Sequence, residues 1–144
     1  MRLCRRNLAG MARLTIRIDL AENAAFGPGK ARLLELIAQT GSIRQAAAAM
    51  DMSYRRAWLL LRETEALTKV PVISARTGGK KGGGTGVTAT GQALVKCYRA
   101  IETEAERSTA ALREKFVGMV NQDLEAQERR KKVTRSRTRK AAEL

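Results

Sequence analysis

The side chains best suited to chemistry in this sequence stand together in Ser53-Tyr54-Arg55-Arg56, directly before a segment with helical apolar spacing. An arginine fork can bind O6 and N7 of a guanine, and a tyrosine hydroxyl can reach a phosphate or a base edge. Ser53 is suited to cap the helix, because its hydroxyl oxygen can accept a hydrogen bond from a free backbone N–H. Two isolated arginines are more commonly part of a solvated helix face, so the surrounding sequence has to decide between these interpretations.

A second group of donors, Arg76, Lys80 and Lys81, lies in the glycine-rich stretch ARTGGKKGGGTG between Ala75 and Gly86. As a nucleotide phosphate loop this stretch fails, because the Walker pattern needs Gly-Lys-Ser/Thr leading into a helix and both lysines precede the last run of glycines. A plain flexible connector is one alternative. We favour a wing that contacts DNA, since glycines let backbone N–H groups approach phosphates while the three cations neutralise charge.

Eight Lys and Arg side chains crowd residues 129–140, in a chain whose formal net charge is +14 and whose pI is about 10.9. Such a charge indicates a polyanionic partner. Aromatic residues make up only 3%, too few for the stacking platforms of single-strand or RNA readers, so double-stranded DNA is the expected partner. We expect residues 127–144 to be a basic tail, disordered or a ragged helix extension, that adds salt-sensitive affinity; a merely solubilising tail is the alternative.

Several kinds of chemistry are disfavoured by the composition. The sequence has no histidine, which removes the commonest general base, the usual nucleophile pairs and imidazole metal ligands. Cys4 and Cys97 form no CxxC motif, and Cys97 is expected to be a small apolar packing residue. We therefore expect no enzyme activity, catalytic residue, cofactor or metal site. The arm at residues 1–11 lacks the apolar run of a signal peptide, and no membrane span is found, so a soluble cytoplasmic protein is expected.

The donors at Ser53 and beyond need a scaffold, and the preceding sequence supplies a helix and a turn. Ser42 and Gln45 match a capping box that starts a short helix. Its body, the alanine run at 46–49, allows a second helix to cross closely, and two methionines flank Asp51, which tolerates a left-handed turn. The pattern predicts a helix-turn-helix in which Ser42, Gln45 and Ser53 position phosphates.

Packing positions on both sides of this motif complete the expected core. Pro28 near the start and Gly41 just past the end bracket a preceding helix that serves as scaffold. In the second helix of the motif, Ala57, Trp58 and Leu61 recur at helical spacing. We expect these three side chains to pack inward.

Short β-rich segments flank the helices. Residues 12–20 alternate apolar with polar side chains, as a half-buried strand does, whereas residues 21–29 read as loop. Residues 70–75 and the pair Val87-Thr88 predict two more strands around the glycine loop. We expect this hairpin to be the wing, and the segment 12–20 to join it in a three-stranded sheet.

A long helix is expected after Thr88, which is suited to cap it. Its apolar stripe has spacings of mostly three and four, at Leu94, Tyr98, Ile101, Ala105, Leu112 and Phe116. The stripe extends past the length of a compact winged helix, so a monomer would expose Leu112 and Phe116. We expect these helices to pair in a homodimer; a short helix with a frayed tail is the alternative.

These patterns predict a mainly α-helical fold with a small β-sheet: a winged helix-turn-helix plus a long C-terminal dimerisation helix. The expected organisation is a flexible basic arm at residues 1–11, a folded domain at 12–126 and the basic tail at 127–144. In the folded domain, Tyr54, Arg55 and Arg56 would read the major groove.

Two stretches carry a likeness to a known family: GSIRQAAAAMDMSYRRAWLLLRETEAL from Gly41 to Leu67, and ISARTGGKKGGGTGVTATGQAL from Ile73 to Leu94. Together they closely resemble the N-terminal DNA-binding domain of ModE, a molybdenum-responsive transcriptional regulator. They are more distantly similar to the winged-helix domain of LysR-type regulators. The likeness covers about residues 14–104.

The resemblance implies a winged helix, a homodimer joined by its terminal helices, and promoter binding in a bacterial cytoplasm. Full-length ModE also carries small β-barrels that bind molybdate, and this sequence has a basic segment in their place. We therefore expect a sequence-specific regulator of molybdenum-related genes that does not bind molybdate itself. It either takes its effector signal from a separate protein or binds DNA constitutively. The alternative is an architectural protein that coats DNA nonspecifically through charge and its tail.

Overall fold

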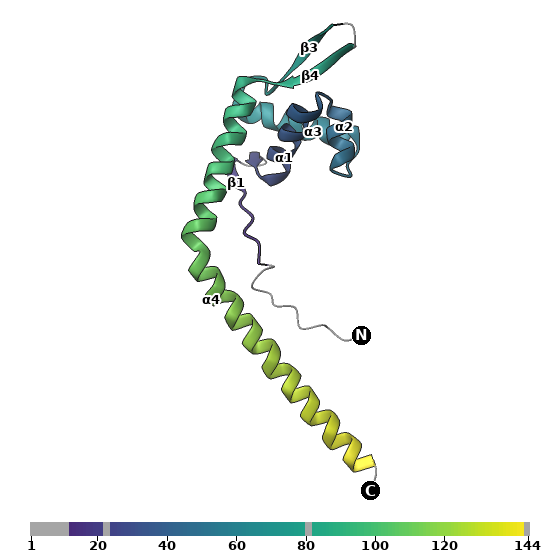
Figure 1. Ribbon diagram of the computed structural model, residues 1–144, viewed down its shortest axis with the longest axis vertical. Helices are drawn as coiled ribbons and strands as arrows, with labels where there is room; N and C mark the ends of the chain where they lie inside the picture. Colours follow the sequence, from purple (N-terminus) through teal and green to yellow (C-terminus); the bar gives the residue numbers. More distant parts are fainter. Residues whose placement is uncertain (1–11, 22–23, 80–81, 143–144) are drawn as a thin grey trace. The chain divides into compact units, whose positions relative to one another are not determined.

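The computed structural model describes residues 12–21, 24–79 and 82–142 (Figure 1). These residues divide into two compact units. The larger unit comprises residues 15–104 and holds the helix-turn-helix and both hairpins. The second combines the segment before residue 15 with residues from 105 onward. The basic arm predicted at residues 1–11 lies outside the described residues.

Helix α1 (Pro28–Thr40) begins and ends as its sequence predicts. Pro28 occupies the first turn, where its missing N–H costs nothing. Gly41 ends the helix in the left-handed region at φ 67°, and its N–H donates to the carbonyl of Ile37. A side chain is disfavoured at that φ, which explains why glycine stands there.

Helices α2 (Ile43–Ala49) and α3 (Tyr54–Thr68) form the predicted helix-turn-helix. The hydroxyl of Ser42 accepts from the N–H of Gln45, and that of Ser53 accepts from the N–H of Arg56 at 3.1 Å. Asp51 takes the left-handed conformation, at φ 52°, in the turn between the two helices. The two predicted serine caps and the turn are confirmed. The predicted capping box is only half formed, because the N–H of Ser42 donates to Oγ1 of Thr40 and not to the Gln45 side chain.

The core of the larger unit gathers side chains from all the helices and from β2. Its buried members are Phe26, Ala31, Leu33, Leu34, Leu36, Ile37, Ile43, Ala46, Ala47, Ala57, Leu61, Val72 and Tyr98. Ala57 and Leu61 are buried as predicted. The prediction for Trp58 is wrong: its side chain is 36% exposed, because it lies at the flank of α3 beside Tyr54 and not on the face that carries Ala57.

The strands form two separate two-stranded sheets, so the predicted three-stranded sheet is wrong. Strand β1 (Ile18–Ala21) is shorter than predicted and pairs antiparallel with β2 (Ala24–Phe26), in a region read as loop. Strand β1 therefore pairs with the nearby β2 and not, as expected, with the wing. The wing itself is the antiparallel pair β3 (Ile73–Gly79) and β4 (Gly82–Val87), seen extending from the helices in Figure 1.

Backbone contacts fix the base of the wing to the helices. The N–H of Thr85 donates to the carbonyl of Gly41 at 2.8 Å, which ties β4 to the turn after α1. On the other side, Thr88 donates its N–H to Val72 and its hydroxyl to the carbonyl of Pro71. The wing is therefore held at both strands near its base.

Helix α4 (Ala89–Ala142) starts at the predicted cap, since Thr88 accepts from the N–H of Gly91. Tyr98 is buried with its ring against Phe26, at 5.3 Å between centroids, and its hydroxyl donates to the carbonyl of Ile16 at 2.8 Å. The neighbouring Cys97 is exposed, so its predicted packing role is wrong: it lies one position, about 100° of helix rotation, from the side chain that faces the core.

An ion pair also joins α4 to α1. Arg99 donates from Nε to Oε1 of Glu35 at 2.7 Å and from Nη2 to Oε2 at 3.0 Å, and it also contacts Glu102. The hydrogen bonds from Arg99 lower the pKa of the Glu35 carboxyl below its ordinary value. This bidentate contact is the geometry in which arginine binds a carboxylate best.

In the second unit, Val117 is buried, and the apolar Leu112 and Phe116 are largely exposed, as predicted for a single protomer. The Arg113 guanidinium contacts the carbonyl of Ala12 in the same unit. The helical backbone of α4 continues through the basic segment to Ala142. Within the described residues, no helix combines the length and apolarity that crossing a bilayer requires.

Candidate nucleic-acid interface

The first turn of α3 presents the three predicted reading residues to solvent. Tyr54 is 46% exposed, and Arg55 and Arg56 are exposed as well. The face carrying Ala57, Leu61 and Thr64 is buried, so the opposite side of the helix is free. None of the three donors is occluded within the protomer, which the proposed contact with a groove requires.

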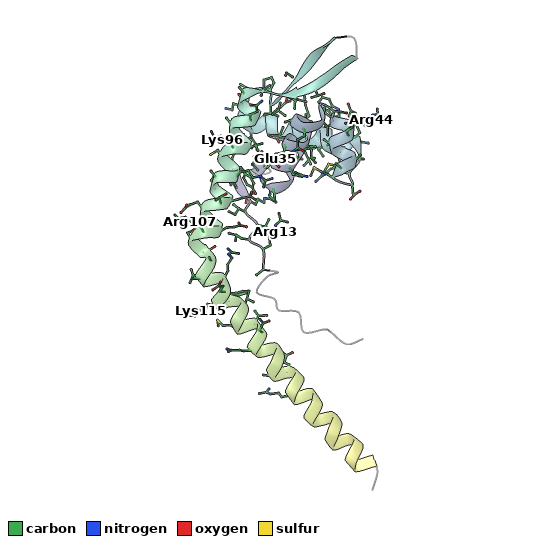
Figure 2. The ribbon with its side chains drawn as sticks, viewed as in Figure 1. Arg13, Glu35, Arg44, Lys96, Arg107 and Lys115 are labelled. Atoms are coloured by element: carbon green, nitrogen blue, oxygen red, sulfur yellow. The ribbon has the colours of Figure 1, made fainter. Side chains whose placement is uncertain are left out.

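Tyr54 lies within a small cluster that spans both helices of the motif. The guanidinium carbon of Arg44, on α2, is 5.6 Å from the centroid of the Tyr54 ring. On the other side, the Trp58 ring meets Tyr54 edge to face, with 6.3 Å between the centroids. Figure 2 shows Arg44 on α2, with Lys96 on α4 on the opposite side of the same unit. The cluster restricts the tyrosine ring and places a third cation, Arg44, beside Arg55 and Arg56 in the first turn of α3.

Arg44 lies outside the set of site residues that the sequence predicts. Its signal was weak, since a single arginine in the first turn of a helix is common on protein surfaces. The usable clue was its position between Ser42 and Gln45, two predicted phosphate contacts.

The remaining predicted site residues are spread over the motif and the wing. Ser42 and Ser53 lie at the starts of α2 and α3, where each hydroxyl is already accepting from a backbone N–H. Gln45 is exposed in the first turn of α2. Arg76 lies in β3 opposite Gly84, although its side chain, like all of Lys80 and Lys81, lies outside the described part of the structure.

A partly buried ion pair anchors α3 to the scaffold. Lys30 of α1 is 9% exposed, and its ammonium donates to the carbonyl of Ala25 at 2.7 Å and pairs with Glu63 of α3 at 2.9 Å. Further along α3, the Glu65 carboxylate accepts from the N–H of Val72. The helix is therefore fixed to β2, α1 and the segment before the wing, while its outer face stays exposed.

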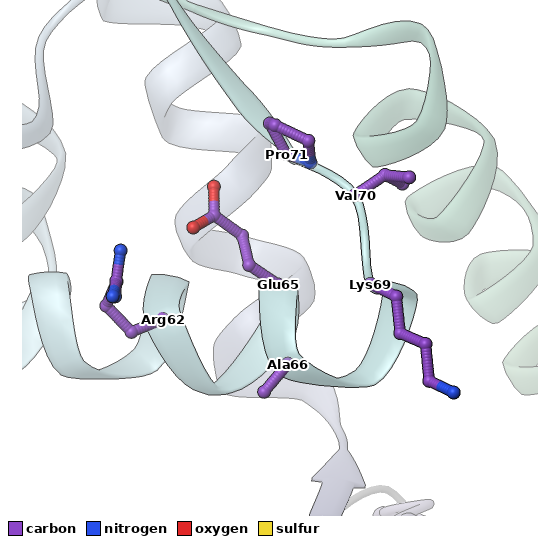
Figure 3. Close-up of a pocket in the computed structure, with 6 residues that line it drawn as sticks. All are labelled: Arg62, Glu65, Ala66, Lys69, Val70 and Pro71. Carbon is purple, nitrogen blue, oxygen red and sulfur yellow. The ribbon is translucent and has the colours of Figure 1, made fainter.

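An open hollow of about 340 Å³ lies at the C-terminal end of α3, lined by Arg62, Glu65, Ala66, Lys69, Val70 and Pro71. Figure 3 shows Arg62 and Glu65 pointing to the same side and Lys69 pointing away. Because Glu65 is engaged with a backbone N–H and the two cations do not converge, the hollow has no arrangement typical of a catalytic site. The described residues also contain no group of three or more His, Cys, Asp or Glu side chains able to hold a metal ion.

The fold and the exposed basic helix define a winged helix-turn-helix protein, with a two-stranded wing and a long helix after it. No family model matches the chain. Individual relatives do: it is 33% identical over 119 residues to the molybdenum transport protein ModE of Azotobacter vinelandii, covering 83% of this chain and 43% of that protein. The predicted resemblance to ModE is thereby confirmed.

Two more relatives carry the same name. The transcriptional regulator ModE of Haemophilus influenzae is 34% identical over 104 residues, which is 72% of this chain and 41% of that protein. The DNA-binding transcriptional dual regulator ModE of Escherichia coli K12 is 34% identical over 87 residues, 60% of this chain and 33% of that protein. The chain therefore spans about two fifths or less of the length of these relatives.

Proposed function

We propose that this chain is a sequence-specific, double-stranded DNA-binding transcriptional regulator of the ModE type. The observation that carries the proposal is the α3 surface: a capped helix whose inner face is fixed to its scaffold and whose first turn exposes Tyr54, Arg55 and Arg56. A major groove admits such a helix, and its first turn then reaches the base edges. The similarity to proteins named as transcriptional regulators supports the same function.

In this proposal the residues have different tasks. Tyr54, Arg55 and Arg56 read bases, whereas the residues around them position the helix on the phosphate backbone. Those positioning residues are Ser42, Gln45 and Ser53 in the helix-turn-helix and Arg76, Lys80 and Lys81 in the wing.

Replacing Arg56 by alanine tests the reading role. On a duplex selected by the wild-type protein, the variant should lose about 1–3 kcal/mol of binding free energy, and it should tolerate more than one base at one position of the site. A matched substitution, Lys96→Ala, removes a charge on the opposite side of the unit and should preserve the preference (Figure 2). Equal loss on every duplex would show that Arg56 contacts phosphate and would argue against base reading.

The high positive charge favours a second candidate, an architectural protein that binds DNA through charge alone. Truncation after Gln127 separates the two functions, because it removes the eight cations crowded in residues 129–140. A truncated regulator should still prefer the same duplex, and its affinity should depend less on salt concentration. A charge-driven binder should lose nearly all affinity.

We further propose that the protein is a homodimer through α4. Leu112 and Phe116 lie one turn apart and are largely exposed, with Met119 one turn beyond. A second copy of the same stripe would bury these side chains as a coiled-coil seam does. The variant Phe116→Glu should sediment as a monomer at concentrations where the wild type is a dimer; an unchanged sedimentation coefficient would contradict the proposal.

The names of the relatives suggest which genes are controlled. We propose that the regulated genes serve molybdenum uptake or use, and that residues 1–144 do not themselves bind molybdate. Genome-wide mapping of bound sites should find molybdenum-related promoters. Calorimetry with molybdate should give no heat of binding to the chain. A measurable affinity would contradict the proposal that the chain does not bind molybdate.

A further inference from the structure

An apolar side chain stands in the middle of the exposed face of α3. Leu59 is 49% exposed, although Ala57, Leu61 and Thr64 on the same helix are at most 1% exposed. With 100° of rotation per residue, the side opposite those three carries Arg55, Leu59 and Arg62. Both arginines are exposed, so the leucine has a cation one turn before it and another one turn after it.

This arrangement indicates what Leu59 contacts. A protein partner that covered the leucine with an apolar pocket would also have to desolvate the arginines at about 6 Å and about 4.5 Å along the axis. A DNA duplex satisfies all three side chains, because phosphates and guanine edges accept from arginine. The major groove also offers one exposed apolar group, the C5-methyl of thymine.

A single exposed leucine is ordinary on a protein surface. Leu59 differs by its place, in the second turn of a helix whose first turn carries Tyr54, Arg55 and Arg56. A helix lying in the major groove along its first two turns brings the Leu59 position toward the bases together with Arg55. The leucine can donate no hydrogen bond there, so any selectivity it confers has to come from apolar contact.

We infer that Leu59 is a specificity-determining residue that contacts the methyl group of a thymine, between contacts made by Arg55 and Arg62. This inference rests on the proposed DNA-binding function. It assigns the apolar part of base recognition to a residue outside the predicted set, and it requires at least one thymine in each half-site of the preferred duplex.

Uracil substitution tests the inference because it removes only the thymine methyl group. A preferred duplex is first selected by the full chain from a random-sequence pool, and each thymine is then replaced singly by deoxyuridine. Wild-type affinity, measured by fluorescence anisotropy, should fall about fourfold at one thymine per half-site, the value of one buried methyl-sized group. The Leu59→Ala variant should bind the unsubstituted duplex more weakly and show no further loss at that thymine.

Two variants control the experiment. Leu20→Ala removes another leucine, 63% exposed on β1, and should keep the wild-type uracil profile. If Leu59→Ala fails to fold, Leu59→Gln replaces it and should also show no further loss at that thymine. A polar side chain fits at this position because Leu59 is half exposed. A flat uracil profile, or a Leu59 variant with the wild-type profile, would overturn this inference alone. A wild-type chain that selects no duplex would overturn the proposed function and this inference with it.

Discussion

Gly91 lies where an added methyl group would meet its neighbours at very short distances. A Cβ atom built there would lie 2.5 Å from the carbonyl oxygen of Val72 and 2.7 Å from Cγ1 of Val87. Neither neighbour can easily give way. The Val72 oxygen accepts from the N–H of Thr88 at 3.0 Å, and Val87 is paired with Ile73 in the wing. The substitution Gly91→Ala therefore forces the start of α4 away from the base of the wing.

The net cost follows from two opposing effects. Overpacking a site that cannot relax costs about 1–3 kcal/mol, and more when backbone has to move. Replacing glycine by alanine in a helix contributes about 0.5–1 kcal/mol in the other direction. Because the contact at Gly91 involves a backbone oxygen, we expect overpacking to dominate and the free energy of unfolding to fall by about 2 kcal/mol.

Gly29 supplies a matched control in the same unit. It lies in the first turn of α1, as Gly91 lies in the first turn of α4, and a Cβ atom there would meet no atom within 4 Å. Gly29→Ala should therefore stabilise the protein, by about 0.4–1 kcal/mol. Urea unfolding followed by circular dichroism measures both changes. A Gly91→Ala protein as stable as the wild type would refute the packing argument.

Four further substitutions test the contacts that hold α3 and the scaffold. Arg99 lowers the pKa of Glu35, so the stability from this pair should be complete above the ordinary value of 4.5 and lost as pH falls through the lower folded pKa. Unfolding at stepwise pH should show the difference between wild type and Arg99→Met shrinking below that value. Ser53→Ala removes the α3 cap and should cost about 1 kcal/mol in urea unfolding. Glu63→Ala leaves the buried Lys30 ammonium unpaired, so it should cost more than Lys30→Met, which leaves the more exposed carboxylate to water; equal costs would contradict this asymmetry.

The helix-turn-helix could be predicted from sequence because its signals are local. Caps at Ser42 and Ser53, the left-handed Asp51 and the glycine after α1 each satisfy a backbone requirement within a few residues. Such requirements depend little on distant parts of the chain. The wing was predictable for a related reason, because two short β-rich segments enclose a glycine-rich loop.

The errors arose where the tertiary context decides. Helical spacing predicts Trp58 in the core, but its ring lies at the flank of α3 against Tyr54. The sequence predicts a partner for β1 in the wing and not in β2, because β2 is only three residues long and has no alternating pattern. Arg44 belongs to the surface around Tyr54 only because α2 and α3 cross there, and one-dimensional spacing cannot report that proximity.

The contacts around Gly41 connect the two parts of the proposed interface. Its left-handed φ ends α1, and its carbonyl accepts the N–H of Thr85 in the wing. A Cβ atom at Gly84 would lie 3.0 Å from the same oxygen, so β4 approaches the turn closely enough to favour glycine. Because α2 begins two residues after Gly41, one turn positions both the start of the helix-turn-helix and the base of the wing. The wing and the helix-turn-helix therefore have a common backbone anchor. A displacement of this turn would change how both of them contact a duplex.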